Sequence, residues 1–183
     1  AESQFLLAEA ALKGWVSGNP GDFYKQGIRL SMSQWGVGSA GTGTGGSPVD
    51  AYINDDTRIP ASYTSDPVAN FPNYSRKSNV TVAWSDAASE EVKLEKIITQ
   101  KWIANYPMGI EAWTEYRRTG YPELAPVIDN LSNGVITDDA RGLRRLRYSF
   151  NEKTLNKANY EAALSLLGGV DNESVDLFWA KKK

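Results

Sequence analysis

Apolar residues recur at helical spacing in the first part of the chain. One set falls on a single helical face: Phe5, Ala8, Leu12, Trp15 and Val16. This pattern predicts a helix that ends at the turn of residues 18–21. A second helix is expected from Asp22, as its cap, to Gly36, and its face carries Tyr24, Ile28, Ser31 and Trp35. Because the link is short, we expect the two helices to pack antiparallel.

Three further helices follow from the same kind of pattern. Ser89 is an N-cap, and the stripe behind it contains Leu94, Ile97, Ile98 and Trp102 before Pro107. A short helix carries Ile110, Trp113 and Tyr116 and ends at Gly120, and a last helix begins at Asn156. Residues 141–149 read as extended. The sequence predicts a mainly α fold of tetratricopeptide-like helical hairpins with long irregular loops, in which Ala8, Ala11 and Gly27 allow close helix packing.

The segments between the helices are long and differ in composition. Residues 36–46 are nearly all Gly, Ser, Thr and Ala, which predicts a mobile surface loop. Residues 47–85 are rich in Pro, Asn, Asp and Ser, yet they carry Tyr52, Tyr63, Phe71, Tyr74 and Trp84. The length of 183 residues fits a single domain over 1–183. Since the chain opens inside an amphipathic segment, we expect it to be part of a longer protein.

Composition narrows the chemistry that this chain can perform. Twenty basic and twenty-two acidic side chains give a net charge of −2, which argues against nucleic acid as a partner. The absence of His and Cys removes the usual nucleophilic triads and most transition-metal sites. The adjacent carboxylates Asp55–Asp56, Glu90–Glu91 and Asp138–Asp139 do not supply two acids facing each other across a cleft. We therefore predict a non-enzymatic protein with no cofactor and no metal.

Four loop aromatics are the candidate ligand-binding residues: Tyr52, Tyr63, Tyr74 and Trp84. Flat aromatic faces bordered by Asn, Asp and Arg suit sugar rings, whose C–H faces stack while their hydroxyls accept and donate hydrogen bonds. The alternative is that these side chains pin the loops to the helices. We assign Trp15, Trp35, Trp102, Trp113 and Tyr116 to helix packing. The arginines at 117, 118, 141, 144, 145 and 147 are expected to hold loops through carboxylates such as Glu111 and Glu115, or else to form an anion-binding patch.

Three passages resemble the SusD/RagB family, and especially its SusD-like branch from Bacteroidetes. The longest is EKIITQKWIANYPMGIEAWTEYRRTGYP at Glu95–Pro122. The others are ESQFLLAEAALKGWVSG at Glu2–Gly18 and RRLRYSFNEKTLNKANYEAALSLLGG at Arg144–Gly169. The resemblance implies a tetratricopeptide-containing helical protein that is lipid-anchored at the outer membrane and faces the cell surface. It also implies a partner, a TonB-dependent outer-membrane transporter, to which captured glycans or peptides are delivered.

The same resemblance places this chain in the C-terminal half of a family member. The lipid anchor and the first helical repeats would then lie upstream of Ala1, outside this chain. Our leading hypothesis is non-enzymatic binding of an oligosaccharide or polysaccharide nutrient. The alternative is a helical scaffold that binds a peptide or another protein, and a carboxylate-based glycosidase ranks last. Exposed aromatics on the loops favour a glycan, whereas an aromatic groove between helices favours a peptide.

Overall fold

The computed structural model describes residues 1–38, 47–64, 73–127, 129–138 and 141–180, and these residues form seven α-helices with no strand. The mainly α fold is confirmed. Contacts group the described residues into two compact units. The first contains those of residues 1–64, 73–116 and 121–123, and the second those of 117–120 and 124–180. The single domain expected over residues 1–183 stays a prediction, and each unit is described by itself.

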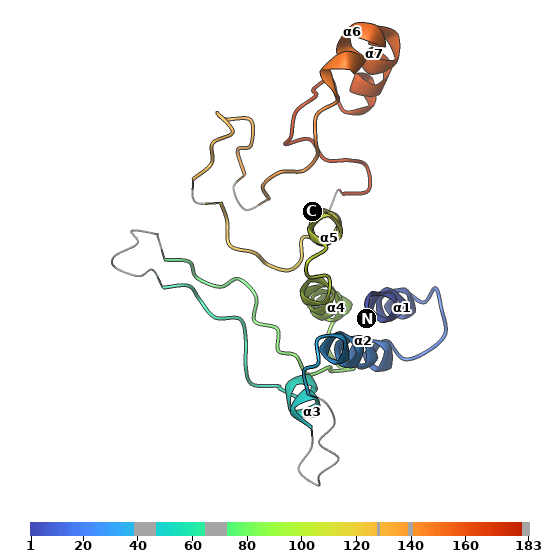
Figure 1. The fold of residues 1–183 in the computed structure, drawn as a ribbon, viewed down its shortest axis with the longest axis vertical. Coiled ribbons are helices and arrows are strands. Elements are labelled where there is room, and N and C mark those ends of the chain that lie inside the picture. Colours follow the sequence, from blue (N-terminus) through green and yellow to red (C-terminus); the bar gives the residue numbers. More distant parts are fainter. Residues whose placement is uncertain (39–46, 65–72, 128, 139–140, 181–183) are drawn as a thin grey trace. The chain divides into compact units, whose positions relative to one another are not determined.

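The first two helices form the predicted hairpin. Helix α1 spans Glu2–Leu12 and helix α2 spans Pro20–Gln34, and they lie side by side in Figure 1. The cap of α2 is Asn19 rather than Asp22, because the Asn19 side-chain oxygen accepts hydrogen bonds from the backbone N–H groups of Gly21 and Asp22. Pro20 occupies the first turn, where its missing N–H is harmless.

Small residues bring these two helices close together, as predicted. A Cβ atom added at Gly27 would lie 2.7 Å from Cε1 of the Phe5 ring, so only glycine leaves room for that ring. Ala8 is fully buried in the same contact region. Phe5 in turn meets the edge of Tyr24, with ring centroids 6.4 Å apart. The hairpin therefore forms one half of the hydrophobic core of the first unit.

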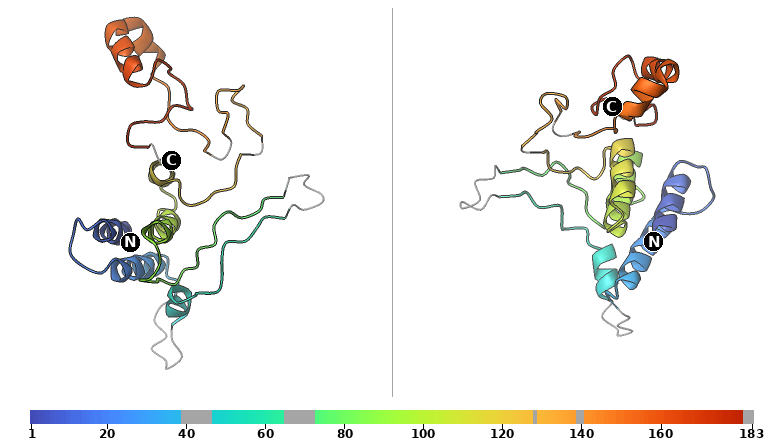
Figure 2. Two further views of the ribbon diagram at one scale, coloured as in Figure 1. Left: turned by 180° about the vertical axis from the view of Figure 1, so that it is seen from behind. Right: turned by 45° about the horizontal axis from the view of Figure 1, so that its top comes forward.

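Helix α4, Glu90–Ala104, forms the other half of this core. It packs on α1 and α2 and buries Leu94, Ile97 and Ile98. Its predicted cap is confirmed, since the backbone N–H of Val92 donates to the Ser89 hydroxyl at 3.3 Å. Figure 2 shows the same grouping of α1, α2 and α4 from two further directions.

A buried lysine ties helix α5, Gly109–Thr119, to α4. Lys101 is 1% exposed, and its Nζ lies 2.8 Å from Glu115 and 3.2 Å from Glu111. Burial alone would lower the pKa of Lys101, but hydrogen bonds and charge from the two glutamates outweigh it and raise the pKa. The ammonium therefore stays charged in the interior.

A short helix, α3, was missed by the sequence analysis. It spans Pro48–Ile53, and the Ser47 hydroxyl caps it by accepting from the backbone N–H of Asp50 at 3.1 Å. Beyond it, residues 54–64 and 73–82 run as two extended segments side by side (Figures 1 and 2). Tyr63 and Tyr74 join them, because each backbone N–H donates to the other residue's carbonyl at 2.9 Å.

The second unit contains helices α6, Phe150–Leu155, and α7, Lys157–Leu166. The last predicted helix is therefore confirmed, with Asn156 immediately before it, whereas α6 was not predicted. Neither helix has a buried residue. Of the predicted loop at 36–46, residues 39–46 lie outside the described part. Within the described residues, no helix has the length and apolar character needed to cross a membrane.

Candidate functional site

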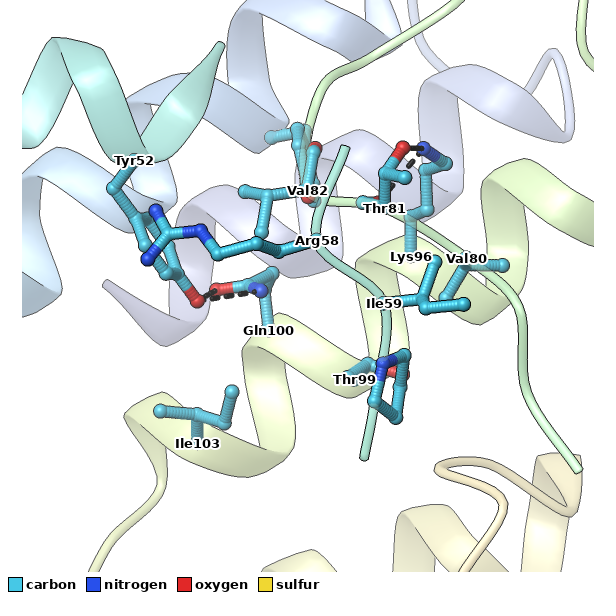
Figure 3. A pocket seen from close by; sticks show the side chains of 12 residues that line it. Tyr52, Arg58, Ile59, Val80, Thr81, Val82, Lys96, Thr99, Gln100 and Ile103 are labelled. Atoms are coloured by element: carbon cyan, nitrogen blue, oxygen red, sulfur yellow. Dashed lines mark hydrogen bonds between the residues drawn. The ribbon is translucent and has the colours of Figure 1, made fainter. Parts of the chain in front are cut away.

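A pocket of about 200 Å³ opens between helix α4 and the loop segments of the first unit. One wall comes from α4 and the opposite wall from the extended segments, as Figure 3 shows. Its lining combines one exposed guanidinium, one ammonium, five side chains with a hydroxyl or amide group and a larger apolar surface. The lining residues are Tyr24, Tyr52, Arg58, Ile59, Pro60, Val80, Thr81, Val82, Lys96, Thr99, Gln100 and Ile103.

Tyr52 is held in one orientation at this pocket by Gln100. Tyr52 lies on α3 and is half-buried, while Gln100 lies on α4 and is buried. The Tyr52 hydroxyl donates to Oε1 of Gln100 at 3.1 Å and accepts from its Nε2 at 3.0 Å. Figure 3 shows the two side chains pointing at each other. The phenol ring is therefore fixed in place before any ligand binds, which reduces the entropy lost on binding.

Residues 80–83, which form one wall of the pocket, are held in place by side chains from α4 and α2. Buried Lys96 donates to the Thr81 carbonyl at 2.8 Å, to the Thr81 hydroxyl at 3.1 Å and to the Ala83 carbonyl at 2.6 Å. The Tyr24 hydroxyl donates to the Val82 carbonyl at 2.8 Å. Burial lowers the pKa of Lys96 and raises that of Tyr24. All three ammonium protons of Lys96 are engaged, so we assign Lys96 to holding the wall rather than to ligand binding.

Arg58 is presented to the pocket by a tight turn. The Asp55 carboxylate accepts hydrogen bonds from the backbone N–H groups of Thr57 and Arg58, both at 3.0 Å, and from the Thr57 hydroxyl at 2.8 Å. It also pairs with Nε of Arg58, and these hydrogen bonds hold the pKa of Asp55 well below its usual range. Arg58 points toward Tyr52 in Figure 3, and its side chain is 75% exposed. Its outer guanidinium nitrogens can therefore donate to a ligand.

The predicted site residues do not all meet here. Tyr52 lines the pocket, and Tyr63, Tyr74 and Trp84 are not among its lining residues. Tyr63 is 48% exposed on the paired extended segments. Trp84 packs against Tyr24, with ring centroids 5.1 Å apart, and its Nε1 donates to Asp86 at 2.9 Å. This packing matches the alternative weighed for Trp84, which is attachment of the loop to the helices.

The packing assignment was wrong for several helix-associated aromatics. Trp15 is 76% exposed because α1 ends at Leu12, so Trp15 is not part of the helical face that packs into the core. Trp35 is 52% exposed, and its ring lies 6.0 Å from that of Tyr106. A groove of about 540 Å³ lies beside Tyr106, where α4 ends and α5 begins. The sequence analysis gave no role to Tyr106, whose exposure depends on the chain direction after α4.

The arginines of the second unit serve as structural ties. Arg144 donates to the Arg117 carbonyl at 2.6 Å and pairs with Asp176 at 2.7 Å, and Arg145 pairs with Asp171 at 2.6 Å. The expectation that arginines hold loops through carboxylates is confirmed for Asp171 and Asp176, while Glu111 and Glu115 both pair with Lys101. In the part of the chain that the structure describes, no group of acidic side chains has the arrangement of a metal site.

The first unit is thus a helical scaffold that carries two extended segments joined at Tyr63 and Tyr74. The chain belongs to the SusD-like family, described as Susd and RagB outer membrane lipoprotein, whose family model matches residues 1–180. The resemblance found in the sequence is thereby confirmed. None of the curated proteins matches the chain.

Solved structures of the family agree closely with this fold. A chitin-binding SusD homolog from Flavobacterium johnsoniae is 44% identical with a TM-score of 0.85, over 100% of this chain and 36% of its own. A SusD homolog from Bacteroides uniformis is 45% identical with a TM-score of 0.85, over 99% and 36%. A SusD-like protein from Bacteroides thetaiotaomicron is 42% identical with a TM-score of 0.84, over 98% and 36%. The chain thus spans just over a third of the length of these proteins.

Proposed function

We propose that this chain is part of a cell-surface protein that binds an oligosaccharide or polysaccharide nutrient without cleaving it. The observation that carries the proposal is the pre-arranged pocket of Tyr52, Gln100 and Arg58. It offers the aromatic face of Tyr52 in a fixed orientation, the carboxamide of Gln100, and the guanidinium of Arg58, whose outer nitrogens are exposed donors. This combination suits a pyranose, which has an apolar face and a rim of hydroxyls.

Family membership supports the glycan class, since one 44% identical relative is a chitin-binding SusD homolog. The family description as an outer membrane lipoprotein supports a location at that membrane. We further propose delivery of the bound glycan to a TonB-dependent transporter, with a lipid anchor supplied outside this chain. Exposed Tyr63, and Tyr74 beside it, would extend the contact along a polymer, whereas Trp84 contributes by holding the loop.

Calorimetric titration of the protein with a panel of neutral oligosaccharides tests the proposal. We expect Tyr52→Ala to weaken the affinity about tenfold, the equivalent of roughly 1.4 kcal/mol, because the stacking face and the hydrogen-bonded frame are both lost. Tyr52→Phe retains the ring and should weaken the affinity by only about threefold, in line with one neutral hydrogen bond.

Leu155→Ala is the matched control, because Leu155 is 83% exposed on α6 in the second unit. It should bind as the unchanged protein does. A folded Tyr52→Ala protein with undiminished affinity would remove Tyr52 from the site. If no oligosaccharide in the panel binds the unchanged protein, glycan capture is wrong.

Peptide binding is the second candidate function. The observation in its favour is the apolar groove at the junction of α4 and α5, where Trp102, Tyr106 and Met108 are all exposed. An aromatic groove beside a helix suits the apolar side chains of an extended or helical peptide. A peptide library panned on the protein separates the two candidates, since enrichment of an apolar motif that is lost with Tyr106→Ala would support this alternative.

A further inference from the structure

The groove at the α4–α5 junction differs from the first pocket in its lining. It is formed by Trp102, Ile103, Asn105, Tyr106, Pro107, Met108, Gly109 and Ala112, with a volume of about 540 Å³. This size lies within the range of about 300–1,000 Å³ that is typical of small-molecule sites. None of these residues carries a charge, so the groove suits a neutral ligand.

Tyr106 lines the groove with an exposed ring, and Trp35, which is not a lining residue, packs beside it. Tyr106 is 72% exposed and Trp35 is 52% exposed, and their planes are inclined by 53° with ring centroids 6.0 Å apart. The two rings contact each other, but their exposed fractions leave part of each ring face open to solvent. Flat exposed faces of this kind stack on the C–H faces of sugar rings.

One polar side chain at the groove has no hydrogen-bond partner. Asn105 is 3% exposed, and its Nδ2 is buried without an acceptor among the described residues. A buried amide donor of this kind is rare in folded proteins unless another molecule supplies the acceptor. The carboxamide can turn readily about its Cβ–Cγ bond, because that torsion has a broad two-fold profile and no side-chain hydrogen bond holds Nδ2.

We infer that this groove binds the acetamido group of an N-acetylated pyranose, with its carbonyl oxygen accepting from Asn105 Nδ2. The acetamido methyl group would contact the apolar wall of Met108 and Ala112, and the sugar ring would stack on Tyr106. A neutral group with one strong acceptor and one methyl matches a lining with one unpaired donor and no charge. This inference rests on the proposed glycan-binding function.

The two binding regions adjoin each other on α4. Ile103 lines both the first pocket and the groove. A β-linked polymer of N-acetylated sugars would therefore engage the groove with one residue and the pocket of Tyr52 with another. Because the two contacts act on one molecule, the combined affinity exceeds that of either region alone.

The test compares two tetrasaccharides with the same β1→4 linkage. N-acetylchitotetraose carries the acetamido group, and cellotetraose has a hydroxyl in its place. We expect the protein to bind N-acetylchitotetraose about tenfold more tightly, the change expected from one hydrogen bond to a previously unpaired donor. In Asn105→Ala this ratio should fall toward one, with no loss of thermal stability, since the substitution removes an unpaired buried group.

Ile110→Ala is the control for the groove, because Ile110 is 76% exposed on α5 and does not line it. It should keep the tenfold ratio. Equal binding of the two sugars by the unchanged protein would overturn the acetamido assignment and leave the glycan function standing, as would an Asn105→Ala protein that keeps the ratio. Absence of binding to both sugars and to every other glycan would overturn the function itself. Displacement of N-acetylchitotetraose by an uncharged apolar peptide at equal affinity would reassign the groove to peptides.

Discussion

The two compact units of this chain are stabilised by different interactions. The first unit has a continuous hydrophobic core in which Phe5, Tyr24, Ile28, Ile97 and Ile98 are each at most 2% exposed. In the second unit, helices α6 and α7 bury no residue, and the buried groups are mainly charged: Arg117, Arg144 and Arg145. Arg144 pairs with Asp176 and donates to the Ala180 carbonyl, Arg145 pairs with Asp171, and Arg117 donates to the Arg144 carbonyl. Loss of buried apolar volume should therefore destabilise the first unit most, and loss of a carboxylate that pairs with a buried arginine should destabilise the second.

Ile97→Ala should give the largest effect. Ile97 is fully buried on α4, so the substitution removes three carbon atoms from the core and leaves a cavity, destabilising the protein by about 2–5 kcal/mol. Leu166→Ala, on the 89% exposed Leu166 of α7, should change stability by less than about 0.5 kcal/mol. Denaturant unfolding followed by circular dichroism measures both. Equal losses in the two proteins would contradict the contrast between the units.

Asp171→Ala should destabilise the second unit, with an effect smaller than that of Ile97→Ala and larger than that of acid. The Asp171 carboxylate is 3% exposed and accepts from Arg145 at 2.6 Å and from the backbone N–H of Tyr148 at 3.2 Å, and it also pairs with Lys153 at 3.4 Å. Removing it leaves the Arg145 guanidinium buried with the Asn172 carbonyl as an acceptor but without its counter-ion, which costs about 1–3 kcal/mol.

Amide hydrogen exchange read by peptide locates this effect. Protection should fall in residues 141–176 of the Asp171→Ala protein and stay unchanged in α1, α2 and α4. A uniform loss over the whole chain would show that the two units unfold together. Glu161→Ala is the control, since the Glu161 side chain is 61% exposed and pairs only loosely with Lys157, at 3.7 Å.

Acid is the mildest of the three perturbations, because it changes protonation alone. Burial alone would raise the pKa values of Asp171 and Asp176, but hydrogen bonds from Arg145 and from Arg141 and Arg144 respectively outweigh it and lower both. Groups with a lowered folded pKa stabilise the fold above their unfolded pKa of about 3.9, and this contribution is lost as the pH falls through the folded value. The second unit should therefore loosen in acid.

Fluorine NMR of 5-fluorotryptophan protein follows this loosening, because Trp179 is the single Trp of the second unit. On acidification below pH 4 the Trp179 resonance should shift or broaden before that of Trp84, which packs on the core of the first unit. If the Trp84 resonance changes first, the ion pairs of Asp171 and Asp176 contribute little to the stability of the second unit. The titration of Lys101 does not affect stability in this pH range, because its raised pKa means that it loses its proton only in strong alkali.

The helices of the core were predictable because their signals are local. The Ser89 cap and the stripe of Leu94, Ile97 and Ile98 lie within one continuous segment, and the structure reproduces both. Helix α3 was missed because it contains only six residues, too few for a periodic pattern to stand out. The prediction placed the cap of α2 at Asp22 and not at Asn19, because Asp also favours a helix start.

The candidate site was predictable only in part, because it depends on residues distant in sequence. Tyr52 was identified from the loop aromatics, but its partner Gln100 follows 48 positions later on α4. Tyr106 and Trp35 were not identified as a pair because their rings meet through the fold. Helical periodicity assigns a face to Trp35 and Trp102, but it does not reveal whether a neighbouring element covers that face.

The close contact at Gly27 couples two positions of the sequence in evolution. Because a Cβ atom there would lie 2.7 Å from the Phe5 ring, alanine at position 27 fits only when the side chain at position 5 is smaller. A change at either position thus alters which changes the other can accept. A descendant of this chain can therefore gain a side chain at position 27 only after Phe5 has been replaced by a smaller residue, and that first step weakens the α1–α2 hairpin.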